Sequence, residues 1–317
     1  MRIVFMGTPD FAAGILEPIV AENLHEIASV VTATDKAAGR GMKIQPSSVK
    51  LCAEKYNLPV LQPEKLRDEA FIEALRNLNA DMFVVVAFRM LPKSVWEIPP
   101  KGTINLHASL LPQYRGAAPI NWVIINGETQ TGVTTFFINE KIDEGNLILA
   151  QAVPILTEDN AGSLHDKLLD AGKNLVLETL KQIENGTFTE TKQILLANEP
   201  LKTAPKLSKE DCIIDWNKTA EEIFHFIRGL SPYPGAFARY KNKDGNESIL
   251  KIFSADFAVE KHNFPLGITH TDGKNFLRIN CKNGFVFAKM LQLFGKKKMP
   301  IHEFLLGNKQ FNEIQLY

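Results

Sequence analysis

The stretch Thr103-Ile-Asn105-Leu-His107-Ala-Ser109-Leu-Leu-Pro112-Gln-Tyr-Arg115-Gly-Ala-Ala-Pro119 begins as a strand and ends at the start of a helix. Residues 103–107 alternate between polar and apolar side chains, and this period of two places Asn105 and His107 on one face of the predicted strand. A loop containing Pro and Gly follows, and the residues from about 117 to 126 predict a helix that ends at Gly127. A strand, a loop and a helix in this order are typical of the α/β class.

The same alternation of strand and helix extends over the first 190 residues. Val-rich apolar runs predict buried parallel strands, and stretches with apolar residues at helical spacing predict the helices that connect them. The strands are expected at residues 3–7, 27–32, 82–88, 131–138 and 147–155, and the helices at 11–20, 46–56, 68–78 and 163–183. The pattern predicts a Rossmann-like, doubly wound parallel sheet in residues 1–190, with ligands at the carboxyl ends of the strands, where Asn105 and His107 lie.

A second, smaller domain is predicted after a polar stretch without periodicity. This stretch contains Pro200 and Pro205, and the linker is assigned to residues 191–207. A helix is expected at about 218–230, and short strands separated by Asp-Gly and Asn-Gly turns follow it. Residues 208–317 are therefore predicted to form a small antiparallel, OB-like β-barrel.

Composition and charge limit the class of protein. The 317 residues carry 36 Lys and Arg against 36 Asp and Glu, but residues 205–317 alone carry 17 against 12, so a mildly basic C-terminal domain follows an acidic N-terminal one. This asymmetry is compatible with binding to a phosphate backbone, and equally with ordinary surface charge. Three scattered cysteines, the lack of a membrane-spanning stretch and a strand that begins at residue 2 predict a cytoplasmic protein without a signal peptide.

Three side chains form a candidate catalytic set. Asn105 and His107 end the predicted strand, and Asp143 follows in the Asp-Glu-Gly145 segment between two further strands. An amide can donate to a developing oxyanion, an imidazole can transfer protons, and a carboxylate can orient the imidazole. The combination suits attack of an amine on a carbonyl, without a nucleophilic Ser or Cys in the motif.

These motifs resemble those of the folate-dependent formyltransferases, which transfer a formyl group from 10-formyltetrahydrofolate to an amine. The resemblance comprises Asn-x-His, then Ser-Leu-Leu-Pro-x-Tyr-Arg-Gly, then an Asp in an x-Asp-x-Gly loop. It implies that Asn105, His107 and Asp143 are catalytic, and that Ser109, Leu110, Leu111 and Pro112 line the folate site. The segment Phe88–Pro92 would form the opposite wall of the pterin pocket. Relatives often have a Tyr-Gly pair where this chain has Phe88-Arg89, and Arg89 is not assigned to the site.

Within that family, the chain is most similar to the members that act on methionyl-tRNA. The similarity includes Lys206-Leu-Ser-Lys-Glu-Asp, Gly229-Leu-Ser-Pro-Tyr-Pro-Gly and Gly295-Lys-Lys-Lys298-Met-Pro in the second domain. It also includes the basic segment Ala-Gly39-Arg-Gly-Met-Lys43, although Met42 stands where relatives often have lysine. The resemblance implies that initiator methionyl-tRNA is bound by Lys36, Arg40, Lys43, Lys296, Lys297 and Lys298.

The sequence thus predicts formyl transfer from 10-formyltetrahydrofolate, as cosubstrate, to methionyl-tRNA, with neither a metal nor an obligate protein partner. One alternative is a nucleotide-sugar N-formyltransferase, which would use the same three catalytic residues. Another is an RNA-binding protein on a degenerate enzyme scaffold, although the intact catalytic set argues against it. Gly7-Thr-Pro9 lacks the Gly-x-Gly-x-x-Gly pattern, so a nicotinamide or flavin dehydrogenase is not expected.

Overall fold

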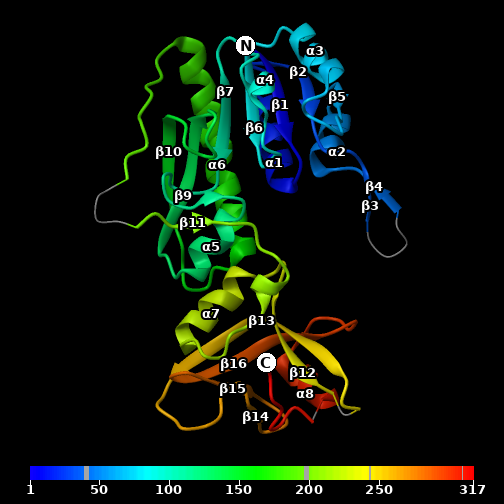
Figure 1. Ribbon diagram of the computed structural model, residues 1–317, viewed down its shortest axis with the longest axis vertical. Coiled ribbons are helices and arrows are strands. Elements are labelled where there is room, and N and C mark those ends of the chain that lie inside the picture. Colours follow the sequence, from blue (N-terminus) through cyan, green and yellow to red (C-terminus); the bar gives the residue numbers. More distant parts are fainter. Residues whose placement is uncertain (39–42, 196–199, 243, 309) are drawn as a thin grey trace. The chain divides into compact units, whose positions relative to one another are not determined.

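The computed structural model describes residues 1–38, 43–195, 200–242, 244–308 and 310–317. It divides into two compact units (Figure 1). The first comprises residues 1–116, 130–154 and 165–203, and the second comprises residues 117–129, 155–164 and 204–317. The second unit therefore contains two short segments that precede residue 165, in addition to its C-terminal part.

The first unit is built on a seven-stranded mixed sheet with the order β10-β9-β7-β6-β1-β2-β5. Five neighbouring strands, from β7 to β5, are parallel. The bounds are β1 (Arg2–Gly7), β2 (Glu26–Val31), β5 (Val60–Leu61), β6 (Met82–Val86), β7 (Thr103–His107), β9 (Gln130–Phe137) and β10 (Leu147–Pro154). β6 is buried at all five positions, as a central strand covered on both faces should be.

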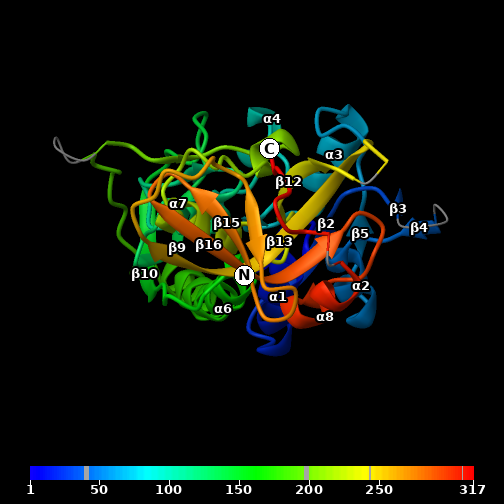
Figure 2. The same cartoon turned by 90° about the horizontal axis from the view of Figure 1, so that it is seen from below.

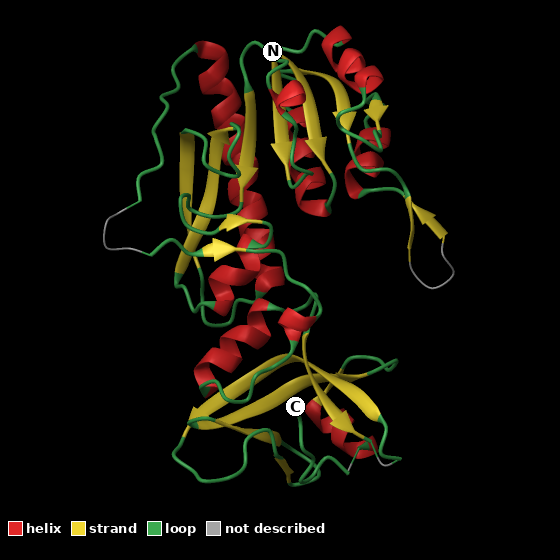
Figure 3. Ribbon diagram, viewed as in Figure 1, coloured by secondary structure: helices red, strands yellow, loops and turns green. Residues whose placement is uncertain are grey.

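Helices cover both faces of this sheet, which confirms the predicted Rossmann-like, doubly wound architecture (Figure 3). Apolar residues of α3 and α4 form a core with β1, β2 and β6. On the other face α1 packs against α6, where Gly14 lies close to Leu169 and Gly172 lies close to Leu106 of β7. The bounds are α1 (Asp10–Ala21), α2 (Ser48–Lys55), α3 (Glu69–Asn77), α4 (Lys93–Trp96) and α6 (Ala161–Asn185).

One edge of the sheet differs from the expected parallel arrangement. β9 runs antiparallel to β7, and β10 runs antiparallel to β9. The connection between β9 and β10 is the short loop 138–146, which has no room for the crossover that a parallel pair needs. Two small strand pairs complete the described part of this region: the hairpin of β3 (Lys36–Ala38) with β4 (Lys43–Gln45), and β8 (Arg115–Gly116) with β11 (Thr203–Ala204).

The second unit is an antiparallel half-barrel with the strand order β12-β13-β16-β15-β14, to which β17 is added beside β16. Figure 2 shows its long strands β13 and β16 from below. Among the described residues, the end strands β12 and β14 do not pair with each other, so the expected small antiparallel domain is present as an open barrel. The bounds are β12 (Ala236–Lys241), β13 (Glu247–Val259), β14 (Thr269–Thr271), β15 (Leu277–Cys281), β16 (Gly284–Leu293) and β17 (Met299–Pro300).

Helices α5 (Pro119–Ile125), α7 (Ala220–Gly229) and α8 (Ile301–Gly307) also belong to the second unit. α7 begins with a capping box, in which Thr219 and Glu222 each accept a backbone hydrogen bond from the other residue. It contributes Ile223 and Ile227 to the core of the half-barrel, against which Ile125 of α5 also packs. Across the described residues, every helix is too short or too polar to span a membrane.

Candidate active site

The carboxyl end of β7 carries the candidate catalytic side chains of the strand. Asn105 pairs with Val85 of β6 and with Phe136 of β9, and His107 pairs with Thr134 of β9. Because strand residues two apart face the same side, the amide and the imidazole share one face, as the sequence predicts. Leu106 points to the opposite face, where it packs beside Gly172 of α6.

The imidazole of His107 is buried and its orientation is fixed by one hydrogen bond. Its Nε2 lies 2.8 Å from the carbonyl oxygen of Tyr114. A carbonyl can only accept, so Nε2 carries the hydrogen and Nδ1 is left as the nitrogen that can exchange a proton. Nδ1 lies 3.9 Å from Oδ2 of Asp143, which is within ion-pair range but beyond the length of a hydrogen bond.

Asp143 lies in the loop between β9 and β10, where a side-chain hydrogen bond and a left-handed backbone conformation fix its position. Oδ2 accepts a hydrogen bond of 2.9 Å from the backbone N–H of Gly116, and the residue itself has a left-handed φ of 53°. Two residues later, a Cβ at Gly145 would lie 1.6 Å from the carbonyl oxygen of Phe137, so only glycine fits there. The loop is therefore closely packed, and the carboxylate is directed between Gly116 and His107.

The amide of Asn105 has a different environment. Its side chain is half-buried, and within the described residues it has no hydrogen-bond partner. An amide held on a rigid strand without a partner is available to a ligand, because no internal bond must break before it can donate.

The predicted folate loop follows β7 directly and is held by buried hydrogen bonds. Ser109 is fully buried, and its hydroxyl donates to the carbonyl oxygen of Gln113 (2.6 Å). Thr134 of β9 donates to the carbonyl of Ser109 and accepts from the N–H of Leu111. The Ser109 side chain thus shapes the loop from inside, while Leu110 and Pro112 are half-buried and remain candidates for ligand contact.

In the segment after β6, the side chain of Arg89 is bound to backbone carbonyls of a neighbouring loop. The guanidinium donates to the carbonyl oxygens of Pro63 (2.8 Å) and Glu64 (3.0 Å) and lies over the ring of Phe88. Burial lowers the pKa of the guanidinium. Arg89 therefore fastens the segment 88–92 to the loop that contains Pro63 and Glu64.

The predicted tRNA-binding residues fall on two described surfaces and on one segment outside them. Lys36 is exposed on β3, and Lys43 lies on the paired strand β4. Arg40 lies outside the described residues. Lys296, Lys297 and Lys298 are exposed in the turn between β16 and β17, where the ammonium of Lys298 lies 4.4 Å from the ring centre of Phe253.

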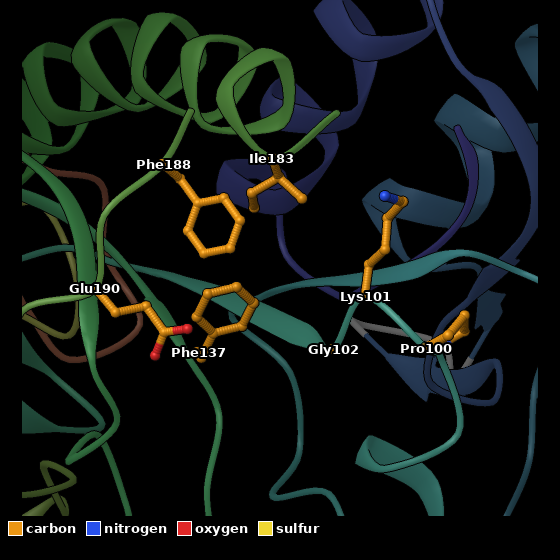
Figure 4. Close-up of a pocket in the computed structure, with 7 residues that line it drawn as sticks. All are labelled: Pro100, Lys101, Gly102, Phe137, Ile183, Phe188 and Glu190. Carbon is orange, nitrogen blue, oxygen red and sulfur yellow. The ribbon is translucent and has the colours of Figure 1, made fainter. Parts of the chain in front are cut away.

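A pocket of about 380 Å³ in the first unit does not contain any predicted site residue (Figure 4). Its Gly102 precedes β7 and its Phe137 is the last residue of β9. The pocket therefore lies at the amino end of β7, and His107 lies at the carboxyl end of that strand. The rings of Phe137 and Phe188 lie next to each other in its lining, with their centroids 5.7 Å apart, and Lys101 and Glu190 also line it. The described residues also contain no group of three His, Cys, Asp or Glu placed to hold a metal ion.

Two kinds of interaction around the site were not anticipated from the sequence. The carbonyl of Tyr114 and the N–H of Gly116 lie inside the quoted motif, but backbone groups leave no signal in side-chain identity. Gln193 contacts the backbone of the Asp143 loop, although it lies in the stretch interpreted as linker. A polar residue in a segment without periodicity gives no sequence signal for such a role.

Comparison with known proteins identifies the family. The family model described as formyl transferase matches residues 1–180, and the model of the formyl transferase C-terminal domain matches residues 206–309. The methionyl-tRNA formyltransferase of Flavobacterium johnsoniae is 52% identical over 317 residues, covering 100% of this chain and 99% of that protein. That of Bacteroides thetaiotaomicron is 50% identical over 309 residues, covering 97% and 95%.

Solved structures share the fold at lower identity. HypX from Aquifex aeolicus in complex with tetrahydrofolic acid has a TM-score of 0.62 and 20% identity, covering 97% of this chain and 47% of its own. WlaRD, a sugar 3N-formyl transferase, has a TM-score of 0.62 and 22% identity, covering 94% of this chain and 99% of its own. Full-length relatives at about half identity, together with both domain models, lead to one conclusion: the chain belongs to the formyl transferase family, among the methionyl-tRNA formyltransferases.

Proposed function

We propose that the chain transfers the formyl group of 10-formyltetrahydrofolate to the α-amino group of methionyl-tRNA in the cytoplasm, where translation uses the product. The observation that carries this proposal is the amide of Asn105, which has no hydrogen-bond partner among the described residues and lies on the same strand face as the buried His107, beside Asp143. The names of the full-length relatives support the acceptor, since they are methionyl-tRNA formyltransferases.

The proposed reaction begins when the free amine attacks the formyl carbon, forming a new C–N bond and an oxyanion. Asn105 donates to that oxygen, which is most effective where the donor is already oriented. The C–N10 bond then breaks, the amine loses one proton, and N10 of the departing tetrahydrofolate gains one. His107 takes part in this transfer through Nδ1, because Nε2 is bound to the Tyr114 carbonyl.

Asp143 places a negative charge beside the nitrogen that takes up the proton. The 3.9 Å separation from Nδ1 is short enough for an ion pair once the ring is charged. The loop from Ser109 to Pro112, which begins two residues after the end of β7, is proposed to line the folate site. Residues 1–190 would thus perform the chemistry.

Residues 208–317 are proposed to hold the tRNA, together with the basic segment from Lys36 to Lys43 of the first domain. Lys36, Arg40 and Lys43 would contact its acceptor end, and Lys296, Lys297 and Lys298 would contact its phosphate backbone. The exposed ammonium groups of Lys296, Lys297 and Lys298 suit this task because each can neutralise one phosphate.

The test is to offer 10-formyltetrahydrofolate with three acceptors in separate reactions: methionyl-tRNA, an amino-sugar nucleotide and glycinamide ribotide. Mass spectrometry of the products is expected to show a formyl group on methionyl-tRNA alone. Formylation of the amino-sugar nucleotide in its place would contradict the proposed acceptor and support the sugar N-formyltransferase alternative.

A further inference from the structure

Gln193 makes four hydrogen bonds around the loop that carries Asp143. Its Nε2 donates to the carbonyl oxygens of Asp143 (2.8 Å) and Gly145 (2.9 Å), and its Oε1 accepts from Nε (3.1 Å) and Nη2 (2.6 Å) of Arg115. These partners determine the orientation of the amide, because the reverse orientation would place its oxygen against two carbonyls. Both N–H hydrogens of Nε2 and both lone pairs of Oε1 are thus in use.

The remaining contacts of Arg115 and of the segment around Gln193 converge on the same loop. Nη1 of Arg115 pairs with Glu144 at 3.0 Å, so guanidinium and amide together hold three consecutive residues, 143–145. Thr191 forms a two-way backbone bridge with Leu147, where the loop ends. The Asn146 amide donates to Glu190 at 2.8 Å. Residues 190–193 therefore lie along one side of the loop 143–147 and fasten it residue by residue.

We propose that Gln193 is a positioning residue that holds the Asp143 carboxylate beside His107. This inference rests on the catalytic role proposed for Asp143. The carboxylate oxygen is 3.9 Å from Nδ1 and 2.9 Å from the N–H of Gly116, so a small displacement of the loop changes both separations. Displacements of about 1 Å in a catalytic group can reduce a rate by on the order of a hundredfold.

Gln193→Glu is the most informative variant. The carboxylate still accepts from Arg115, but it has no hydrogen to donate and sets negative oxygen against the carbonyls of Asp143 and Gly145. A role limited to anchoring Arg115 predicts normal turnover for this variant. The positioning role predicts that kcat falls by roughly tenfold or more, while KM for both substrates changes by less than about threefold.

The experiment compares kcat and KM of the full chain with those of Gln193→Glu, Gln193→Met and Thr191→Ala, with thermal unfolding of each. Gln193→Met has similar length and lacks all four hydrogen bonds, those to Arg115 included. If Gln193→Glu does not fold, Gln193→Met still tests whether this side chain supports turnover, and its cycle with Asp143→Asn tests whether it acts through the carboxylate. Thr191→Ala is the matched control, because its bridge to Leu147 uses the backbone. It is expected to retain the original kcat.

A double-mutant cycle with Asp143→Asn tests whether Gln193 acts through the carboxylate. If it does, Gln193→Glu reduces single-turnover rates much less in the Asp143→Asn background than in the unmodified chain. Equal reductions in the two backgrounds, an unchanged kcat in Gln193→Glu, or a rise in KM alone would overturn the positioning role. Normal turnover of Asp143→Asn itself would instead refute the function proposed for Asp143, whatever the result at Gln193.

Discussion

The single hydrogen bond from His107 to the Tyr114 carbonyl assigns different tasks to the two ring nitrogens. Nε2 is committed to the loop, and only Nδ1 faces Asp143. Substitution at this residue should therefore affect chemistry more than substrate binding.

Substitutions of Asn105 and His107, the two polar side chains on the site face of β7, test whether these residues act in the chemical step. Asn105→Ala and His107→Ala are expected to lower single-turnover rates by roughly two orders of magnitude, as the loss of an oxyanion donor or of an acid–base group usually does. Affinity for 10-formyltetrahydrofolate, measured by fluorescence titration, should change little. His302→Ala serves as the control because that ring is exposed on α8. A near-normal rate in either β7 variant would show that its assigned role is wrong.

At the scale of elements, the loop between β9 and β10 depends on a glycine. A methyl group at Gly145 would collide with the Phe137 carbonyl, so Gly145→Ala must displace the loop that carries Asp143. We expect kcat to fall by about tenfold or more while the fold persists. Gly307→Ala is the matched control, since nothing lies within 4 Å of an added Cβ there. Turnover of Gly145→Ala equal to that of Gly307→Ala would contradict the dependence of catalysis on this loop.

Helix α7 contains a histidine that should make the stability of the chain depend on pH. Burial, and then the charge of Arg228, lower the pKa of His225, whose Nδ1 accepts from Nε of that arginine. The unfolded chain keeps the proton up to a pH of about 6.5, so stability decreases as the pH falls below that value toward the lower pKa of the folded state.

Thermal unfolding at several pH values between about 7.5 and 5.5 measures this effect, because the range spans the ordinary histidine pKa. The melting temperature of the unmodified chain should decrease more on acidification than that of His225→Gln, which keeps an acceptor for Arg228. His302→Gln should follow the unmodified chain. Identical pH dependence in all three proteins would show that His225 contributes nothing to it.

At the scale of the whole molecule, the basic turn between β16 and β17 should govern the affinity for tRNA and its salt dependence. Replacing Lys296, Lys297 and Lys298 by Ala is expected to weaken tRNA binding and to flatten its dependence on salt, by roughly 0.9 in logarithmic slope for each phosphate that the variant no longer neutralises. Alanine at Lys261, Lys274 and Lys282 removes the same charge from other exposed positions of the second unit, and these lysines are matched controls. If both triple variants weakened binding equally, general charge and not this turn would account for the affinity.

The sequence predicted most of the architecture because the relevant signals are local. Apolar periodicity located β6, α3 and α6, and the Asn-x-His motif identified the face of β7 that carries the candidate site. The antiparallel edge formed by β9 and β10 was not foreseen, because the side-chain pattern does not encode strand direction; the short connection at 139–146 is the signal that excludes a parallel crossover. Gln193 was missed because its partners, two backbone carbonyls and the Arg115 guanidinium, lie about 50 to 80 residues away along the chain.

The division of the chain between its two units has a consequence for synthesis on the ribosome. Residues 117–129 belong to the second unit, yet the β-strands of that unit begin only after residue 230. α5 therefore emerges from the ribosome about a hundred residues before α7 and the half-barrel core against which Ile125 packs, and at the usual elongation speed this gap lasts several seconds. We expect the face of α5 that carries Ile125 to remain exposed on the nascent chain during that interval and to bind chaperones there.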